Sequence, residues 1–260
     1  MTTTDLLSTE TFGWRPGPPE RPQADFSVAF PLAGLANSYE YPRFPLPSAT
    51  ASRRQSRLAY EAAVLTKRAM DVVVSLATIS MLAPVFVVTA IAVKFTSPGP
   101  VFFRQERIGL HGRAFRVLKF RSMTAGAEKN VAELMAENGG YQPFYKIRND
   151  PRVTRVGRFL RRASIDELPQ LFNVLRGDMS LVGPRPQVYA EVEQYAFQHT
   201  TRLTVKPGIT GLWQVSGRSD LAWPDAVRLD MRYVDTWSLA GDVGILLKTA
   251  KAVVTSRGAY

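Results

Sequence analysis

An apolar stretch without a charged side chain runs through residues 72–93 and is interrupted near its middle by Pro84. About 20 apolar residues in a helix are long enough to cross the hydrocarbon core of a bilayer. Pro84, however, removes a backbone donor and clashes with the preceding turn, so we expect a kink or a reversal of the helix there. The stretch therefore predicts a membrane segment built around a break, within a helical region at residues 56–96.

Basic residues flank this stretch on both sides. Lys67 and Arg68 precede it, and the basic residues that follow it are Lys94, Arg104, Arg107, Arg113 and Arg116. Basic residues favour the cytoplasmic side of a membrane, so a helix that enters and returns on the same face satisfies both flanks. From these residues alone, a kinked helix that spans the membrane is an equal alternative.

The excess of positive charge lies after residue 66. The chain of 260 residues has a formal net charge of +11, whereas residues 1–66 hold six basic and six acidic side chains. A basic domain suits nucleic acid, an anionic membrane or a phosphorylated substrate. Because the sequence has no nucleic-acid recognition motif and the apolar stretch favours a membrane, we expect no nucleic-acid partner. The lack of cysteine excludes disulfides and thiolate chemistry, and two histidines are too few for a histidine-built metal site.

The first 55 residues differ in composition from the rest. They are rich in proline, serine and threonine and show no sustained periodicity, which predicts a disordered or linker arm at residues 1–55. The start of the chain lacks the charged and apolar regions of a cleavable signal peptide, so we expect the bulk of the protein to be cytoplasmic.

Residues 97–260 carry the patterns of a small, helix-rich α+β domain. Strand patterns at residues 101–109 and 114–123 are joined by glycines and predict a β-hairpin. Helical patterns occupy residues 125–138, 154–163, 164–177, 186–198, 223–237 and 239–257. The last pattern has one apolar face, which suits an amphipathic helix in a membrane interface or a core-facing helix equally well.

Two adjacent carboxylates, Asp166 and Glu167, are the strongest candidates for chemistry. Ser164 followed by Glu167 fits a capping box, which predicts a helix that begins close to Asp166 and ends at Gly177. A helix N-terminus favours anions, so an ionised Asp166 could attack phosphorus there while Glu167 helps to hold Mg²⁺ against the charge of a diphosphate. Taken alone, such a pair is more often a helix cap with a surface salt bridge.

Cations accompany this pair. Lys119 and Arg121 alternate along the second strand and share one face, where they could contact a phosphate or a lipid headgroup or simply be solvated. The remaining candidates for phosphate neutralisation are Arg158, Arg161, Arg162, Arg185 and Arg218.

Six motifs in one order resemble the bacterial sugar transferase family, the monotopic phosphoglycosyl transferases that initiate polysaccharide and glycoconjugate synthesis on a polyprenyl phosphate. The likeness covers residues 67–260, and its motifs are KRAMD, LAP, SPGPVFFRQERIG, FRVLKFRSM, DELPQLFNVLRGDMSLVGPRP and KPGITGLWQVSGR. It implies transfer of a hexose 1-phosphate from a UDP-hexose to undecaprenyl phosphate, with release of UMP, through a covalent intermediate on Asp166. It also implies a re-entrant membrane helix broken at Pro84, at the bacterial inner membrane, with the catalytic domain of residues 97–260 on the cytoplasmic face.

The resemblance assigns further roles. It implies that Glu167 supports Mg²⁺ or proton handling, with Asp178 helping to organise the metal. The loop residues that it implies as nucleotide and phosphate contacts are Pro184, Arg185, Pro186 and Arg218. The alternative is a non-catalytic, membrane-bound assembly or regulatory protein of the same fold. The sequence leaves open which hexose is used and whether the protein forms a homo-oligomer.

Overall fold

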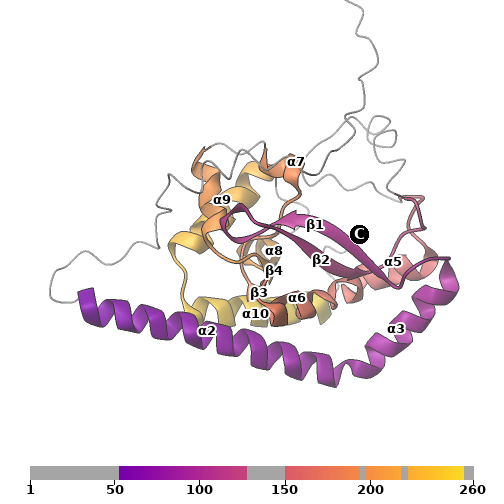
Figure 1. Ribbon diagram of the computed structural model, residues 1–260, viewed down its shortest axis with the longest axis horizontal. Helices are drawn as coiled ribbons and strands as arrows, with labels where there is room; N and C mark the ends of the chain where they lie inside the picture. The colour runs from indigo at the N-terminus through magenta and orange to yellow at the C-terminus, as the bar shows by residue number, and fades with distance from the viewer. Residues whose placement is uncertain (1–52, 128–149, 194–196, 218–221, 255–260) are drawn as a thin grey trace, which may run out of the picture. The chain divides into compact units, whose positions relative to one another are not determined.

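The computed structural model describes residues 53–127, 150–193, 197–217 and 222–254, all within one structural unit that comprises residues 40–260. It is a helix-rich α+β structure with two small sheets, as the sequence predicts (Figure 1). The predicted arm at residues 1–55, apart from the helical backbone from Arg53, and most of the predicted helix at residues 125–138 lie outside the described residues. Among the described elements, the helices and 3₁₀ turns are α2 (Arg53–Met81), α3 (Ala83–Thr96), η1 (Leu110–Gly112), α5 (Arg155–Arg162), η2 (Ile165–Glu167), α6 (Gln170–Arg176), α7 (Tyr189–Val192), η3 (Phe197–Thr204), α8 (Leu212–Ser216), α9 (Trp223–Asp235) and α10 (Leu239–Val254), and the strands are β1 (Phe102–Ile108), β2 (Ala114–Phe120), β3 (Ser180–Val182) and β4 (Gly208–Thr210).

The apolar stretch forms the second part of α2 and most of α3, with a bend of 64° between the two helices. The break falls at Leu82, and Pro84 lies in the first turn of α3, where its missing donor costs no helical hydrogen bond. Within the described residues, neither helix alone has the length and apolar composition to cross a bilayer, while the bent pair taken together does. The predicted bend near Pro84 is confirmed, whereas a re-entrant path stays a prediction.

The bent pair exposes many large apolar side chains. In α2 and α3 they include Val73, Leu76, Met81, Val87, Val88, Ile91 and Phe95. Single exposed apolar residues are ordinary on protein surfaces, but this many on two consecutive helices are typical of a surface that meets another apolar phase.

The predicted hairpin is confirmed. Strands β1 and β2 are antiparallel and pair from Phe102 opposite Phe120 to Ile108 opposite Ala114. The connection at Gly109 to Gly112 uses left-handed backbone at His111 and Gly112. Arg121 lies one residue beyond β2, and its amide donates to the Val101 carbonyl at 2.9 Å.

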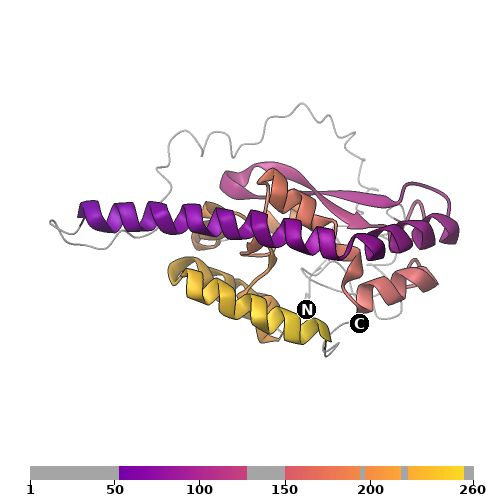
Figure 2. The same cartoon turned by 90° about the horizontal axis from the view of Figure 1, so that it is seen from below.

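A second sheet pairs the short strands β3 and β4 in parallel. It belongs to a hydrophobic core that includes Val174 of α6, Val182 of β3, Val234 of α9 and Ile245 of α10. Figures 1 and 2 show α2 lying along the side of the domain that carries α6, β3 and α10, while α3 turns towards the end that carries α5.

Two of the predicted C-terminal helices are present and one is not. The pattern at residues 223–237 forms α9, which ends at Asp235, and the pattern at residues 239–257 forms α10, described to Val254. In place of one helix at residues 186–198 there is the single turn α7 and then η3, with residues 194–196 outside the described set. Helix α10 buries Asp242 and Ile245 and leaves Val243 and Leu247 exposed. Its apolar side is therefore divided between the core and the surface.

Candidate active site

The carboxylate pair follows a short cationic helix that is fixed at its start. Thr154 caps α5 by accepting a hydrogen bond from the Gly157 amide at 2.9 Å. Gly157 packs so closely on the segment after β2 that an added Cβ would lie 1.9 Å from the Ser122 carbonyl oxygen. Only a glycine fits there, and the contact holds α5 against the end of β2.

The turn that carries the pair differs from the predicted helix start. Ser164 has a left-handed backbone conformation, with φ 56°, and its side chain makes no capping hydrogen bond, so the expected capping box with Glu167 is wrong. Residues 165–167 form the 3₁₀ turn η2, and α6 begins only at Gln170, after Pro169. Asp166 therefore lies before the helix rather than at its N-terminus, although the predicted end at Gly177 is confirmed.

Asp166 is buried, with 8% of its surface exposed. Burial raises the pKa of its carboxyl above the ordinary value, and the neighbouring Glu167 charge raises it further. The charges of Lys119 and Arg161 act in the opposite direction and lower that pKa. The site thus combines a desolvated carboxylate with cations that favour its ionised form.

The carboxylate of Glu167 is held by β2. Lys119 Nζ lies 2.7 Å from Glu167 Oε1, and both side chains are partly buried. Arg161 donates from Nε to Ser122 Oγ at 2.8 Å, which directs its guanidinium alongside the pair. Three predicted residues, Lys119, Arg161 and Glu167, thus surround Asp166, while Arg162 is exposed at the end of α5.

Arg121 has different surroundings from those predicted. Its side chain is 7% exposed, and Nη2 donates to the carbonyl oxygens of Val93 at 3.3 Å and Ser97 at 2.6 Å, at the C-terminal end of α3. A cation at this end of a helix interacts favourably with the free carbonyls and the helix dipole. Arg121 therefore ties α3 to the end of β2, and a phosphate-binding role for it stays a prediction.

The loop with Pro184, Arg185 and Pro186 lies at the other end of the hairpin. Arg107 donates to the Pro186 carbonyl at 3.1 Å, and the adjacent Ile108 amide donates to the Gln187 carbonyl at 2.9 Å. Ile108 pairs with Ala114, five residues from Lys119, so the backbone positions of β2 nearest the loop and nearest the carboxylate pair are about 17 Å apart along the strand.

Within the loop, the Arg185 guanidinium lies over the ring of Trp213, 5.9 Å from its centroid. Trp213 itself is buried. This geometry is that of a cation–π contact, which fixes the direction of Arg185. Arg218 lies outside the described residues.

The two predicted metal ligands are not brought together. Asp178 follows α6 and contacts Asn173, whereas Glu167 precedes α6, so about 10 Å of helix lies between them. Across the described parts of the chain, no three acidic or histidine side chains gather in a group that could hold a metal ion.

Asn173 is a site-supporting residue that the sequence did not reveal. It is fully buried, accepts from the Leu118 amide at 3.0 Å and donates to the Arg116 carbonyl at 2.8 Å. These bonds cover the free edge of β2 and fix α6 against the strand that carries Lys119. No local pattern distinguishes such an asparagine from one on the surface of a helix.

The chain is similar to known proteins over most of the described residues. The family model for bacterial sugar transferases matches residues 62–256. The chain is 44% identical over 212 residues to the undecaprenyl-phosphate galactose phosphotransferase of Salmonella typhimurium, an alignment that covers 80% of this chain and 44% of that protein. It is 43% identical over 200 residues to the exopolysaccharide production protein ExoY of Rhizobium meliloti, covering 75% of this chain and 88% of the relative.

A third relative is the UDP-glucose:undecaprenyl-phosphate glucose-1-phosphate transferase of Caulobacter vibrioides, 43% identical over 205 residues, which are 75% of this chain and 72% of that protein. The chain thus spans less than half of the Salmonella relative and most of the other two. Because the family model covers most of the chain and the relatives exceed 40% identity, the chain belongs to the bacterial sugar transferase family.

Proposed function

We propose that this protein transfers a hexose 1-phosphate from a UDP-hexose to undecaprenyl phosphate, with release of UMP, and so initiates synthesis of an exopolysaccharide or a related glycoconjugate. The observation that carries the proposal is the buried Asp166 carboxylate, surrounded by Glu167, Lys119 and Arg161. The names of the relatives, which act on undecaprenyl phosphate with galactose or glucose, support the substrate class.

The proposed chemistry has two steps. In the first, an Asp166 oxygen attacks the phosphorus that bears the hexose, the bond to the bridging oxygen breaks, and UMP leaves with that oxygen. In the second, a phosphate oxygen of undecaprenyl phosphate attacks the same phosphorus and frees the Asp166 carboxylate. Division into two steps allows one cationic site to serve a soluble donor and a lipid acceptor in turn.

The cations have two tasks in this scheme. Lys119 and Arg161 lower the pKa of Asp166, which keeps more of it ionised for attack. They also offset the negative charge of a diphosphate as it approaches a carboxylate. Arg185, directed by its contact with Trp213, is the proposed contact for the nucleotide end of the donor, at the far end of the hairpin.

We also propose Mg²⁺ as cofactor, held by Glu167 with help from Asp166 and the phosphates of the donor. Mg²⁺ is commonly bound by one or two carboxylates together with substrate phosphates and water, and the adjacent carboxylates fit that mode. When bound, the ion would neutralise charge on the diphosphate. A contribution from Asp178 would require movement around α6, so we favour Glu167 as the protein's main ligand.

For the membrane, we propose that the bent pair enters and returns on one face, with the catalytic domain on the cytoplasmic side of the inner membrane. The support is that the residues on both sides of the apolar stretch bind the same domain. Lys67 and Arg68 of α2 donate to Val182 and Val174, and the carbonyls at the end of α3 accept from Arg121. The exposed apolar side of α10, at Val243 and Leu247, would then rest in the interface.

Intact mass spectrometry tests the proposal. The purified full chain is incubated with Mg²⁺ and either UDP-galactose or UDP-glucose, without lipid, and Asp166→Asn serves as the matched variant. We expect a hexose-phosphate adduct on the parent protein only, with an equal amount of UMP, and the donor that reacts identifies the hexose. UMP that appears only after undecaprenyl phosphate is added would argue for direct transfer, and no UMP under either condition would favour the non-catalytic role.

A further inference from the structure

One turn of α2 makes an unusual set of polar contacts with the catalytic domain. Lys67, Arg68 and Asp71, here called the α2 anchor, lie just before the apolar stretch and bind groups that are more than 100 residues away in sequence. Basic residues at such a position would ordinarily face water or lipid headgroups. Here they are directed into the protein.

Arg68 binds the end of α6. Its Nη1 donates to the Val174 carbonyl at 2.6 Å, and its Nη2 donates to the Leu175 carbonyl at 2.9 Å. These carbonyls belong to the last turn of the helix, where Val174 also accepts from the Gly177 amide at 3.0 Å, so the guanidinium fork adds to the backbone cap of α6.

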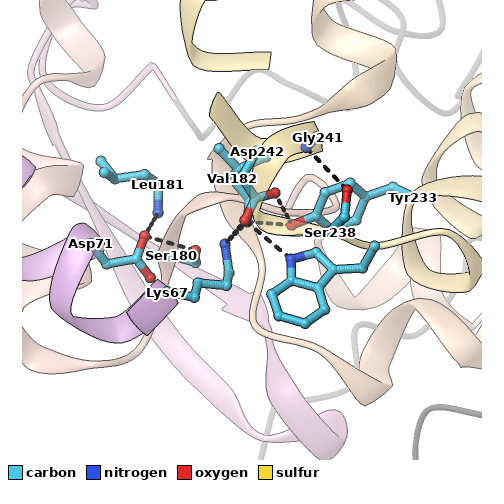
Figure 3. Close-up of polar contacts among 10 residues, drawn as sticks. Lys67, Asp71, Ser180, Leu181, Val182, Tyr233, Ser238, Gly241 and Asp242 are labelled. Carbon is cyan, nitrogen blue, oxygen red and sulfur yellow. Dashed lines mark hydrogen bonds and ion pairs between the residues drawn. The ribbon is translucent and has the colours of Figure 1, made fainter. Parts of the chain in front are cut away.

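Asp71 binds the next element, β3. It is buried, and its Oδ1 accepts from Ser180 Oγ at 3.1 Å and from the Leu181 amide at 3.0 Å (Figure 3). Lys67 completes the contact by donating to the Val182 carbonyl at 3.1 Å. The α2 anchor therefore holds both ends of residues 174–182, at residues 174 and 175 and at residues 180–182.

Asp242 of α10 fixes Lys67 from the other side. Lys67 Nζ lies 2.6 Å from Asp242 Oδ2, which also accepts from Trp237 Nε1 at 3.1 Å, while Asp242 Oδ1 accepts from the Tyr233 hydroxyl at 2.8 Å (Figure 3). Asp242 is fully buried, and its charge is compensated by Lys67 and the two neutral donors. Lys67 is thus held by α10 as well as by β3.

The held segment lies between the two halves of the candidate site. Helix α6 follows the turn with Asp166 and Glu167, and β3 leads directly into the loop with Pro184, Arg185 and Pro186. A shift of residues 174–182 would change the separation of the reactive carboxylate and the loop. Misplacement by about 1 Å can lower a rate about 100-fold, because the reacting atoms must be aligned.

We propose that Lys67, Arg68 and Asp71 are positioning residues, which fix the separation between the carboxylate pair and the loop at residues 184–186 by holding residues 174–182. They touch neither the donor nor the acceptor in this scheme. The geometric claim stands independently, and its effect on turnover rests on the proposed function.

The absence of native cysteine permits a direct test of the geometry. Spin labels at Arg155→Cys in α5 and Ala190→Cys in α7, both exposed positions, report the separation of the two halves by pulsed electron resonance on the full chain in detergent. Arg68→Ala and Asp71→Ala should broaden or shift the distance distribution. Thr66→Ala, on the same helix, is the control and should match the parent, because the Thr66 hydroxyl donates within α2 to the Ala62 carbonyl at 2.8 Å.

Conservative variants distinguish a positioning role from an effect of charge and from a failure to fold. Asp71→Asn keeps an oxygen that accepts from Ser180 and Leu181, so it should restore the parent distribution. Arg68→Lys keeps the charge but cannot donate two hydrogen bonds from one planar group, so it should broaden the distance distribution. It replaces Arg68→Ala in the test if that variant does not fold. Two results would overturn the proposal. One is a parent-like distance distribution in the folded Arg68 variants, and the other is a distribution in Asp71→Asn as broad as in Asp71→Ala.

Turnover provides the second measurement. In folded Arg68→Ala we expect kcat for UMP release to fall about 100-fold with little change in KM, because alignment rather than binding is lost. A rise in KM at unchanged kcat would contradict the positioning role. If the parent releases no UMP, the proposed function fails, but the distance measurement still decides the geometric claim.

Discussion

Replacement of Asn173 by alanine should destabilise the domain strongly, because it removes two hydrogen bonds from the free edge of β2. The Leu118 amide and the Arg116 carbonyl would lose the only side chain shown to bond them at that edge within the described structure. Leaving a buried polar group without a partner costs about 1–3 kcal/mol, so the two together cost about 2–6 kcal/mol. That is a large part of the roughly 5–15 kcal/mol by which a typical protein is stable.

Thermal unfolding of the detergent-purified protein at a fixed scan rate measures this effect. For a domain of this size, about 1 kcal/mol corresponds to about 2–4 °C in Tm, so we expect a decrease of about 4–24 °C. Gln105→Ala is the matched control, since this amide on the same hairpin bonds the Arg107 side chain and, among the described residues, no backbone group of β2. It should lower Tm by no more than about 4 °C.

The activity of the Asn173→Ala protein provides a second measurement. Because Lys119 is on β2, a strand loosened from α6 should hold Glu167 less well, and kcat of the folded Asn173→Ala protein should fall. A Tm for Asn173→Ala within the range of the Gln105→Ala control would refute the reasoning that Asn173 supports β2.

Three further outcomes are expected. Lys119→Met removes a positive charge, so it should raise the pKa of Asp166 and move the acid limb of the kcat/KM profile to higher pH. Glu167→Gln removes a negative charge, so it should lower that pKa and move the limb to lower pH. Shifts in the opposite directions would contradict Asp166 as the nucleophile. Gly157→Ala should prevent stable folding, because its Cβ would lie 1.9 Å from the Ser122 carbonyl oxygen. Gly244→Ala places a Cβ in open space within α10 and should raise the free energy of unfolding by about 0.5–1 kcal/mol, because alanine favours a helix more than glycine does. Thermal unfolding of both variants measures these effects. Chelation of divalent ions should stop UMP release, and added Mg²⁺ should restore it; release that persists in chelator would count against the proposed cofactor.

Local patterns in the sequence predicted the elements of the site better than its contacts. The hairpin that carries Lys119, the cationic helix that carries Arg161 and the bend near Pro84 all follow from periodicity, turn residues and proline chemistry within short windows. The capping box at Ser164 failed because the same spacing also fits a 3₁₀ turn, and the left-handed backbone that selects the turn depends on the packing of α5 and α6 around it.

The supporting contacts could not be predicted in this way, because they join residues far apart in the chain. Asn173 and Leu118 are separated by 55 positions, and Lys67 and Asp242 by 175. A buried asparagine or lysine has the same local signature as an exposed one, and only the tertiary structure supplies its partner. The candidate nucleophile was predictable because Asp166 and Glu167 form a motif, whereas the residues that hold its surroundings do not.

The two attachments of the bent helix pair connect membrane placement with organisation of the site. Arg121 ties the end of α3 to the end of β2, two residues after Lys119, and Arg68 ties α2 to the end of α6, which follows Asp166. In the proposed re-entrant arrangement, the bilayer holds the bent pair through its exposed apolar side chains. The two attachments then fix the positions of β2 and α6, the elements next to the carboxylates. Extraction into a detergent that distorts the pair should then impair donor cleavage even when the acceptor lipid is absent from the assay, since the first step already depends on the alignment of Asp166.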